Sequence, residues 1–129
     1  MADDATALSA EFVVDAGVPS FPVLSPDGEW VMFVVTAVGQ AGELPTSALW
    51  IAAADGSEPP RTLAAGSAEN SNPRWAPDSR SILFLSDRSE RGTAQLHRTT
   101  PSGGGVEALS SWRGGIRGTS RWPNRIWSR

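Results

Sequence analysis

Few residues in this chain could support nucleophilic catalysis. Its 129 residues include one histidine, His97, and no cysteine. A serine nucleophile needs a histidine that a carboxylate orients, and it often lies in a Gly-x-Ser-x-Gly turn between a strand and a helix. The nearest string is "GTSRW" at residues 118–122, in which Trp122 replaces the second glycine. A bulky side chain there would block the close approach of strand and helix, so we assign no catalytic role to Ser120.

The sequence does not place a histidine and an orienting carboxylate beside a serine nucleophile. His97 lies in "AQLHRT", which we predict to be a strand with His97 as a partly exposed member. The pair Asp87-Arg88 could seat the terminus of a substrate, but we favour a turn-stabilising aspartate beside a solvated arginine. The sequence therefore predicts no catalytic site.

Ligands for metals and cofactors are also scarce. One histidine and no cysteine argue against zinc. The acidic turns "SPDG" and "APDS" are not followed by a 12-residue calcium loop. No phosphate-binding or dinucleotide-binding glycine pattern occurs. We expect no metal site and no cofactor.

A phrase that occurs twice is the strongest pattern in the chain. "FPVLSPDGEWVMFVVT" at residues 21–36 is echoed by "NPRWAPDSRSILFLSDR" at residues 72–88. Proline fixes φ at a turn, aspartate can accept a bond from the backbone two residues on, and glycine adopts positive φ without steric cost. We interpret these positions, and a further Asp-Gly pair, as the structural turns of a repeat: Pro26, Asp27, Gly28, Asp55, Gly56, Pro77 and Asp78.

Each copy of the phrase begins a unit of short extended segments separated by turns. The apolar runs "WVMFVV" and "SILFLS" are continuous, which fits strands covered on both faces. A buried helix is the alternative, but these runs are short and turn residues bound them. Four short antiparallel strands in each unit of about 40–50 residues are typical of a β-propeller blade. We predict an all-β fold with about two four-stranded antiparallel blades of an incomplete β-propeller, at residues 14–66 and 70–112, within a partial propeller at 14–116.

Three tryptophans, Trp30, Trp50 and Trp75, fall in predicted strands. Their rings could stack on sugars or bases, or they could pack between blades. We favour packing between blades.

The repeat resembles the PD40 (WD40-like, TolB-type) propeller repeat. The strings that carry the resemblance are "LSPDGEWVMFV", "PRWAPDSRSILFLSDR" and "AQLHR". The wording is most similar to the N-terminal propeller of the prolyl oligopeptidase (S9) family of serine peptidases, in particular acylaminoacyl-peptidase and dipeptidyl aminopeptidase relatives. Two positions depart from the repeat: Ser79 stands where glycine is usual, and Ser102 where aspartate is usual.

The resemblance implies a function for the intact relative rather than for this chain alone. In that family a separate hydrolase domain carries a Ser-Asp-His triad, and the propeller admits peptides to it. The chain itself would then be a propeller fragment of a hydrolase and not an enzyme. The alternative is a non-enzymatic TolB-like or WD40-like module for protein–protein interaction.

The two ends of the chain differ in charge. All 14 acidic residues lie at or before Glu107, and five of the 11 arginines follow it. We read residues 1–13 as an acidic leader without a signal pattern, and residues 117–129 as a basic tail that is disordered or translated out of frame from a truncated gene. The other reading of the tail is an arm that binds nucleic acid or anionic lipid.

Partners and location follow from the same observations. Peptide substrates are expected for the intact relative, and self-association or a protein partner could complete the propeller. We expect no nucleic-acid partner and no membrane partner, and a cytoplasmic location.

Overall fold

The described part of the chain contains eight strands. The computed structural model describes residues 17–37 and 42–116; the expected leader 1–13, the tail 117–129 and Ser120 lie outside them. The strands are β1 Val18–Leu24, β2 Trp30–Thr36, β3 Ser47–Ala53, β4 Arg61–Ala64, β5 Asn70–Trp75, β6 Ile82–Ser86, β7 Gln95–Thr99 and β8 Glu107–Ala108. Within these described ranges no helix occurs that could cross a membrane.

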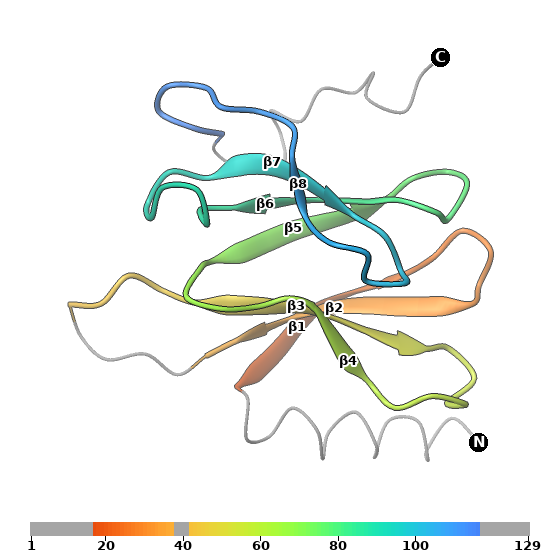
Figure 1. The fold of residues 1–129 in the computed structure, drawn as a ribbon. Coiled ribbons are helices and arrows are strands. Elements are labelled where there is room, and N and C mark those ends of the chain that lie inside the picture. Colours follow the sequence, from red (N-terminus) through yellow and green to blue (C-terminus); the bar gives the residue numbers. More distant parts are fainter. Residues whose placement is uncertain (1–16, 38–41, 117–129) are drawn as a thin grey trace.

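The strands form two antiparallel meanders. One sheet has the order β1-β2-β3-β4 and the other the order β5-β6-β7-β8, and Figure 1 shows the two sheets stacked one on the other. Within each sheet, every strand pairs with the next one in the sequence, as in a propeller blade. The predicted all-β fold with two four-stranded blades is confirmed.

The continuous apolar runs are explained by burial on both faces of β2 and β6. Met32 and Val34 of β2 belong to the core between the sheets, whereas Phe33 and Val35 belong to a cluster on the opposite face. Strand β6 divides in the same way, with Ile82 and Phe84 in the core between the sheets and Leu83 and Leu85 on the outer face. Because alternate side chains of a strand point to opposite faces, a strand covered on both sides has no polar alternation.

The core between the sheets is the largest apolar cluster. It holds eight buried side chains that come from both sheets: Met32, Val34, Leu49, Ile51, Ala64, Trp75, Ile82 and Phe84. Trp30 packs against it, so the packing expected for Trp30 and Trp75 is observed. Trp50 instead lies on the outer face of the first sheet, where its ring stacks on Phe33 with centroids 6.3 Å apart.

The first strand of each sheet is irregular at the same place. The register of β1 shifts between Ser20 and Val23, and that of β5 shifts between Ser71 and Arg74. Each irregular stretch contains a proline, Pro22 or Pro73. Proline cannot donate to a ladder and is accommodated at bulges and edge strands, so the shift follows from the sequence.

Candidate functional site

The first Pro-Asp turn is held by its aspartate. Asp27 Oδ1 accepts hydrogen bonds from the Ser25 hydroxyl at 2.6 Å and from the Glu29 backbone N–H at 3.0 Å. The Gly28 N–H donates to Ser25 O at 2.9 Å, and Gly28 has a φ of 76°. The hydrogen bond from Ser25, followed by that from Glu29, lowers the pKa of Asp27. Pro26 therefore opens a tight turn that leads directly into β2.

The second Pro-Asp turn has the same construction with one difference. Asp78 Oδ1 accepts from the Arg80 N–H at 2.9 Å after Pro77, and the Ser79 N–H closes the turn onto Ala76 O at 3.0 Å. Ser79 occupies the place of Gly28 and has a φ of 62°, in the region that favours glycine. The sequence identified this departure, and the structure shows its contact: Ser79 Oγ accepts the Asp27 backbone N–H at 3.0 Å.

The Asp-Gly turn joins β3 and β4. Asp55 Oδ1 accepts from the Ser57 N–H at 2.8 Å, and the Gly56 N–H donates to Ala53 O at 3.0 Å. Gly56 has a φ of 77°, and the hydrogen bonds with Ser57 lower the pKa of Asp55. All three turns stabilise backbone geometry, and none of them presents a group aligned for chemistry.

Asp87 organises the loop between β6 and β7 and ties it to the first sheet. Its buried carboxylate accepts from the backbone N–H groups of Glu69 and Gly92 at 2.8 and 2.9 Å, and from Arg91 at 2.6 Å. Arg91 also donates to Pro45 O at 3.0 Å in the loop before β3. Burial raises the pKa of Asp87, but these hydrogen bonds and the Arg91 charge outweigh it, so the pKa is lowered overall. The partner of the turn-stabilising aspartate is Arg91 rather than the exposed Arg88.

A buried polar pair joins β3 to β5 and was not identified from the sequence. The Ser47 hydroxyl donates to Asn70 O at 2.6 Å and accepts the Asn70 N–H at 2.8 Å. The Asn70 side-chain amide donates to Ser47 O at 2.6 Å. The available signal was that one strand begins with Ser47 and another with Asn70. That the two residues meet depends on how the two sheets pack.

His97 is buried, which corrects the expectation that it would be partly exposed. Only 1% of its surface is accessible, and its ring stacks on Phe84 with centroids 5.9 Å apart. Nδ1 lies 3.0 Å from Gln95 O, and Nε2 has no hydrogen-bond partner among the described residues. Burial lowers the pKa of His97, which favours the neutral form of the ring. The register explains the burial, because His97 pairs with Phe84, whose ring is in the core between the sheets.

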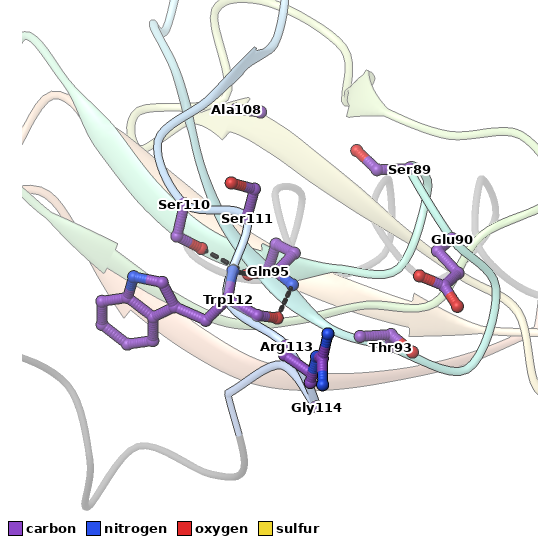
Figure 2. Close-up of a pocket in the computed structure, with 10 residues that line it drawn as sticks. All are labelled: Ser89, Glu90, Thr93, Gln95, Ala108, Ser110, Ser111, Trp112, Arg113 and Gly114. Carbon is purple, nitrogen blue, oxygen red and sulfur yellow. Dashed lines mark hydrogen bonds between the residues drawn. The ribbon is translucent and has the colours of Figure 1, made fainter.

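A polar cavity of about 510 Å³ lies beside the second sheet (Figure 2). It is bounded by the loop after β6 and by the segment after β8, and Glu90 and Arg113 contribute charged groups. The Gln95 side chain holds these parts together: its Oε1 accepts from the Ser110 hydroxyl at 2.7 Å and its Nε2 donates to Trp112 O at 2.6 Å. The residues that line the cavity include no histidine.

The described part of the chain contains no cluster of three or more histidine, cysteine, aspartate or glutamate residues that could hold a metal ion. The predicted turns, the Asp87 loop and the Gln95 cavity are therefore separate features of the structure and do not form one site. Their shared property is that they fix one sheet, or one loop, relative to its neighbour.

The sequence and the fold were compared with those of known proteins. No family model matches the chain. It is 36% identical over 110 residues to the uncharacterized peptidase YuxL of Bacillus subtilis, a match that covers 84% of this chain and 15% of that protein. The chain thus spans about a seventh of the length of this relative.

Two solved structures share the fold. A puromycin-hydrolyzing peptidase of Mycobacterium tuberculosis superimposes with a TM-score of 0.61 and 22% identity, over 74% of this chain and 14% of that chain. A TolB protein of Agrobacterium tumefaciens superimposes with a TM-score of 0.56 and 23% identity, over 73% of this chain and 34% of that chain. The two sheets of this chain therefore share the blade fold of a TolB-type propeller, and their sequence is similar to that of a peptidase, in agreement with the resemblance found in the sequence.

Proposed function

We propose that this chain is propeller sequence of a prolyl-oligopeptidase-like serine peptidase, and that the propeller limits which peptides reach a separate hydrolase domain. The observation that carries the proposal is the 36% identity with the peptidase YuxL over 110 residues, together with the propeller-like fold of the described residues. The hydrolytic step belongs to a domain outside the 129 residues, because these contain no Gly-x-Ser-x-Gly string.

The way in which the two sheets are joined supports a filtering role. A propeller that selects peptides by size has to be rigid. The sheets share an apolar core and are linked by the bond from Asp27 to Ser79, by the Ser47–Asn70 pair and by the bond of 3.0 Å from Trp75 Nε1 to Val23 O. Packed cores and satisfied buried polar pairs resist deformation.

The coding sequence beyond the codon for Arg129, read in all three frames, tests the assignment. A frame that carries further Pro-Asp-Gly blades and then a Gly-x-Ser-x-Gly turn is the expected result. Further blades followed by a stop codon, without a hydrolase domain, would overturn it.

A direct assay tests the catalytic part of the proposal. The purified chain is expected to show no hydrolysis of aminoacyl or acyl-peptide chromogenic substrates above a buffer control. Turnover that scales with the concentration of the chain would contradict the proposal.

A non-enzymatic binding module is the second candidate, and the fold shared with TolB favours it. In that case the loops at the ends of the strands would bind a protein partner. The sequence match to a peptidase at 36% identity, against 23% for TolB, is the reason for preferring the first candidate. The same reading of the downstream frames separates the two.

A further inference from the structure

The segment that leaves the second sheet is longer than the segment that leaves the first. In the first sheet three residues, 65–67, separate the pairing of β4 with β3 from the contact of Ala68 with the start of β3. In the second sheet six residues, 110–115, separate the hydrogen bond of Leu109 to β7 from the contact of Ile116 with the start of β7. The second sheet therefore carries an additional turn that the first sheet lacks.

Gln95 fastens this additional turn to β7. The Gly115 N–H donates to Trp112 O at 3.0 Å, which closes the turn. Gln95 Oε1 accepts from the Trp112 N–H at 3.0 Å and from the Ser110 hydroxyl at 2.7 Å. Gln95 Nε2 donates to Trp112 O at 2.6 Å, and the Gln95 residue is only 7% exposed. Because its anchor is buried in the sheet, the turn is held in one position.

The polar cavity between this turn and the loop after β6 lies on the face of the second sheet that is directed toward the first. Gln95 and Ala108 both line the cavity. Gln95 is two residues from His97 on β7, and Ala108 pairs with His97 across β7 and β8, so the three side chains point to one face. That face carries Phe84, whereas a following blade would pack on the opposite face, that of Leu83. A further blade of the same polypeptide therefore does not pack on the face where the cavity lies.

Two opposite charges lie at this cavity without a partner among the described residues. Glu90 comes from the loop after β6, and Arg113 comes from the additional turn. The ion pairs in the described part of the chain join other residues, and neither of these two side chains makes a hydrogen bond there. In Figure 2 the carboxylate of Glu90 and the half-exposed ring of Trp112 lie on opposite sides of Gln95. Four residues that line the same cavity carry hydroxyl groups: Ser89, Thr93, Ser110 and Ser111.

We propose that this cavity binds a short peptide with free termini, with the peptide ammonium group at Glu90 and the peptide carboxylate at Arg113. A carboxylate pairs with an ammonium group, and a guanidinium group can donate two parallel hydrogen bonds to a carboxylate. The hydroxyl groups match the amide groups of the peptide, and the exposed Trp112 ring provides an apolar surface for a peptide side chain. The volume of about 510 Å³ lies within the range of about 300–1,000 Å³ that is usual for small-molecule sites.

The choice of a peptide rests on the proposed function, whereas the opposite charges belong to the cavity itself. A site that binds both termini holds a short peptide and not an internal segment of a long chain, because an internal segment has no charged ends. The two proposals can fail separately. A coding sequence without a hydrolase domain beyond Arg129 would overturn the peptidase assignment only, and a chain that binds no peptide would overturn the cavity proposal only.

An NMR titration of the purified chain is the first test. Dialanine, trialanine and tetra-alanine are each added up to about 10 mM, a concentration above the Kd of a millimolar complex. The expected result is a saturable change in amide chemical shifts at residues 89–93 and 110–114 for at least one of the three peptides. Unchanged spectra with all three peptides, or changes centred on other residues, would overturn the proposal.

Blocked peptides and charge variants test which residue binds which terminus. N-acetylation of the best peptide, or Glu90→Gln in the chain, should each weaken binding by about threefold to tenfold. Glu90→Gln should not weaken the acetylated peptide further, because the interaction is already absent. C-terminal amidation and Arg113→Gln should show the same relationship. Glu58→Gln and Arg80→Gln, at exposed positions outside the cavity, are the matched controls and should bind like the parent chain.

Two outcomes of this experiment contradict the assignment. If blocking either terminus leaves the affinity of the parent chain unchanged, the cavity does not bind that terminus. If Glu90→Gln weakens the acetylated peptide as much as the free peptide, Glu90 maintains the shape of the cavity and does not pair with the ammonium group; the same holds for Arg113→Gln and the amidated peptide. Should a variant not fold, the comparison of free and blocked peptides on the parent chain decides.

Discussion

The backbone N–H of Asp27 donates to the hydroxyl of Ser79 at 3.0 Å, so the two Pro-Asp turns of the repeat are bonded to each other across the two sheets. Ser79 is the position at which the repeat usually has glycine, and its φ of 62° lies in the region that favours glycine. The Ser79 backbone thus has an unfavourable conformation, while its hydroxyl provides a hydrogen bond between the two blades. The two contributions can be separated by substitution.

Substitution at Ser79 is expected to distinguish the bond from the strain. Ser79→Ala keeps the positive φ and removes the hydroxyl, so the free energy of unfolding should fall by about 0.5–1.5 kcal/mol. Ser79→Gly also removes the hydroxyl but relaxes the backbone, so it should be the more stable of the two variants by about 0.5–1 kcal/mol. Urea denaturation of both variants beside the parent chain measures the difference. If Ser79→Ala is as stable as the parent chain, the bond between the turns contributes nothing.

Asp87→Asn should destabilise the chain more than the same change at the other aspartate of the second repeat. Asp87 is buried and accepts bonds from Glu69, Gly92 and Arg91, whereas Asp78 accepts one from the Arg80 N–H. Loss of charge-assisted hydrogen bonds costs about 1.5–3 kcal/mol. Asp78→Asn is the matched control, and its unfolding midpoint in urea should lie close to that of the parent chain. Equal midpoints for the two variants would show that the Asp87 loop is not a stabilising contact.

The turns and strands could be predicted from the sequence because their causes are local. Pro26, Asp27 and Gly28 fix a turn through their own backbone preferences, and the aspartate bonds a residue only two positions away. The run "WVMFVVT" became β2 at residues 30–36 because its length and its flanking turns exclude a helix. The two-face burial of that strand was also predicted from its lack of alternation.

The contacts between sheets could not be predicted, because they depend on packing. Ser47 and Asn70 are 23 residues apart, and Arg91 reaches the carbonyl of Leu44 from 47 residues away. The burial of His97 was missed for the same reason. The alternation in "AQLHRT" indicates that His97 and Leu96 face opposite ways, but both faces of the second sheet turned out to be apolar. No local rule tells which polar residue will tolerate burial.

The free energy of unfolding should depend on His97 in mildly acidic solution. Burial lowers the pKa of His97 below its usual 6.5, so the unfolded chain binds a proton more readily than the folded one. Stability is therefore fully present above pH 6.5 and is lost as the pH falls below it, by at most about 1.4 kcal/mol for each pH unit. The measurement is urea denaturation at pH 7.5, 6.5 and 5.5.

The matched variant for this dependence is His97→Phe. It keeps an aromatic ring against Phe84 and removes the titrating group, and the carboxylates are common to both proteins. As the pH falls from 7.5 to 5.5, the free energy of unfolding of the parent chain should decrease relative to that of the variant. A difference that is constant over this range would mean that His97 does not titrate differently in the folded and unfolded chain.

Gly115→Ala should loosen the segment that covers the outer face of the second sheet. A Cβ at Gly115 would lie 2.5 Å from Ala94 O and 3.0 Å from Thr93 Cγ2, and the residue has a φ of 71°. The neighbouring Gly114 has a φ of 80° but an open surrounding, so Gly114→Ala carries the backbone strain without the clash. Both variants should be less stable than the parent chain. Only Gly115→Ala should break the bond from the Ile116 N–H to Ala94 O, seen as faster hydrogen exchange of the Ile116 amide. Equal exchange at Ile116 in the two variants would show that the close approach of Gly115 to β7 does not hold this segment.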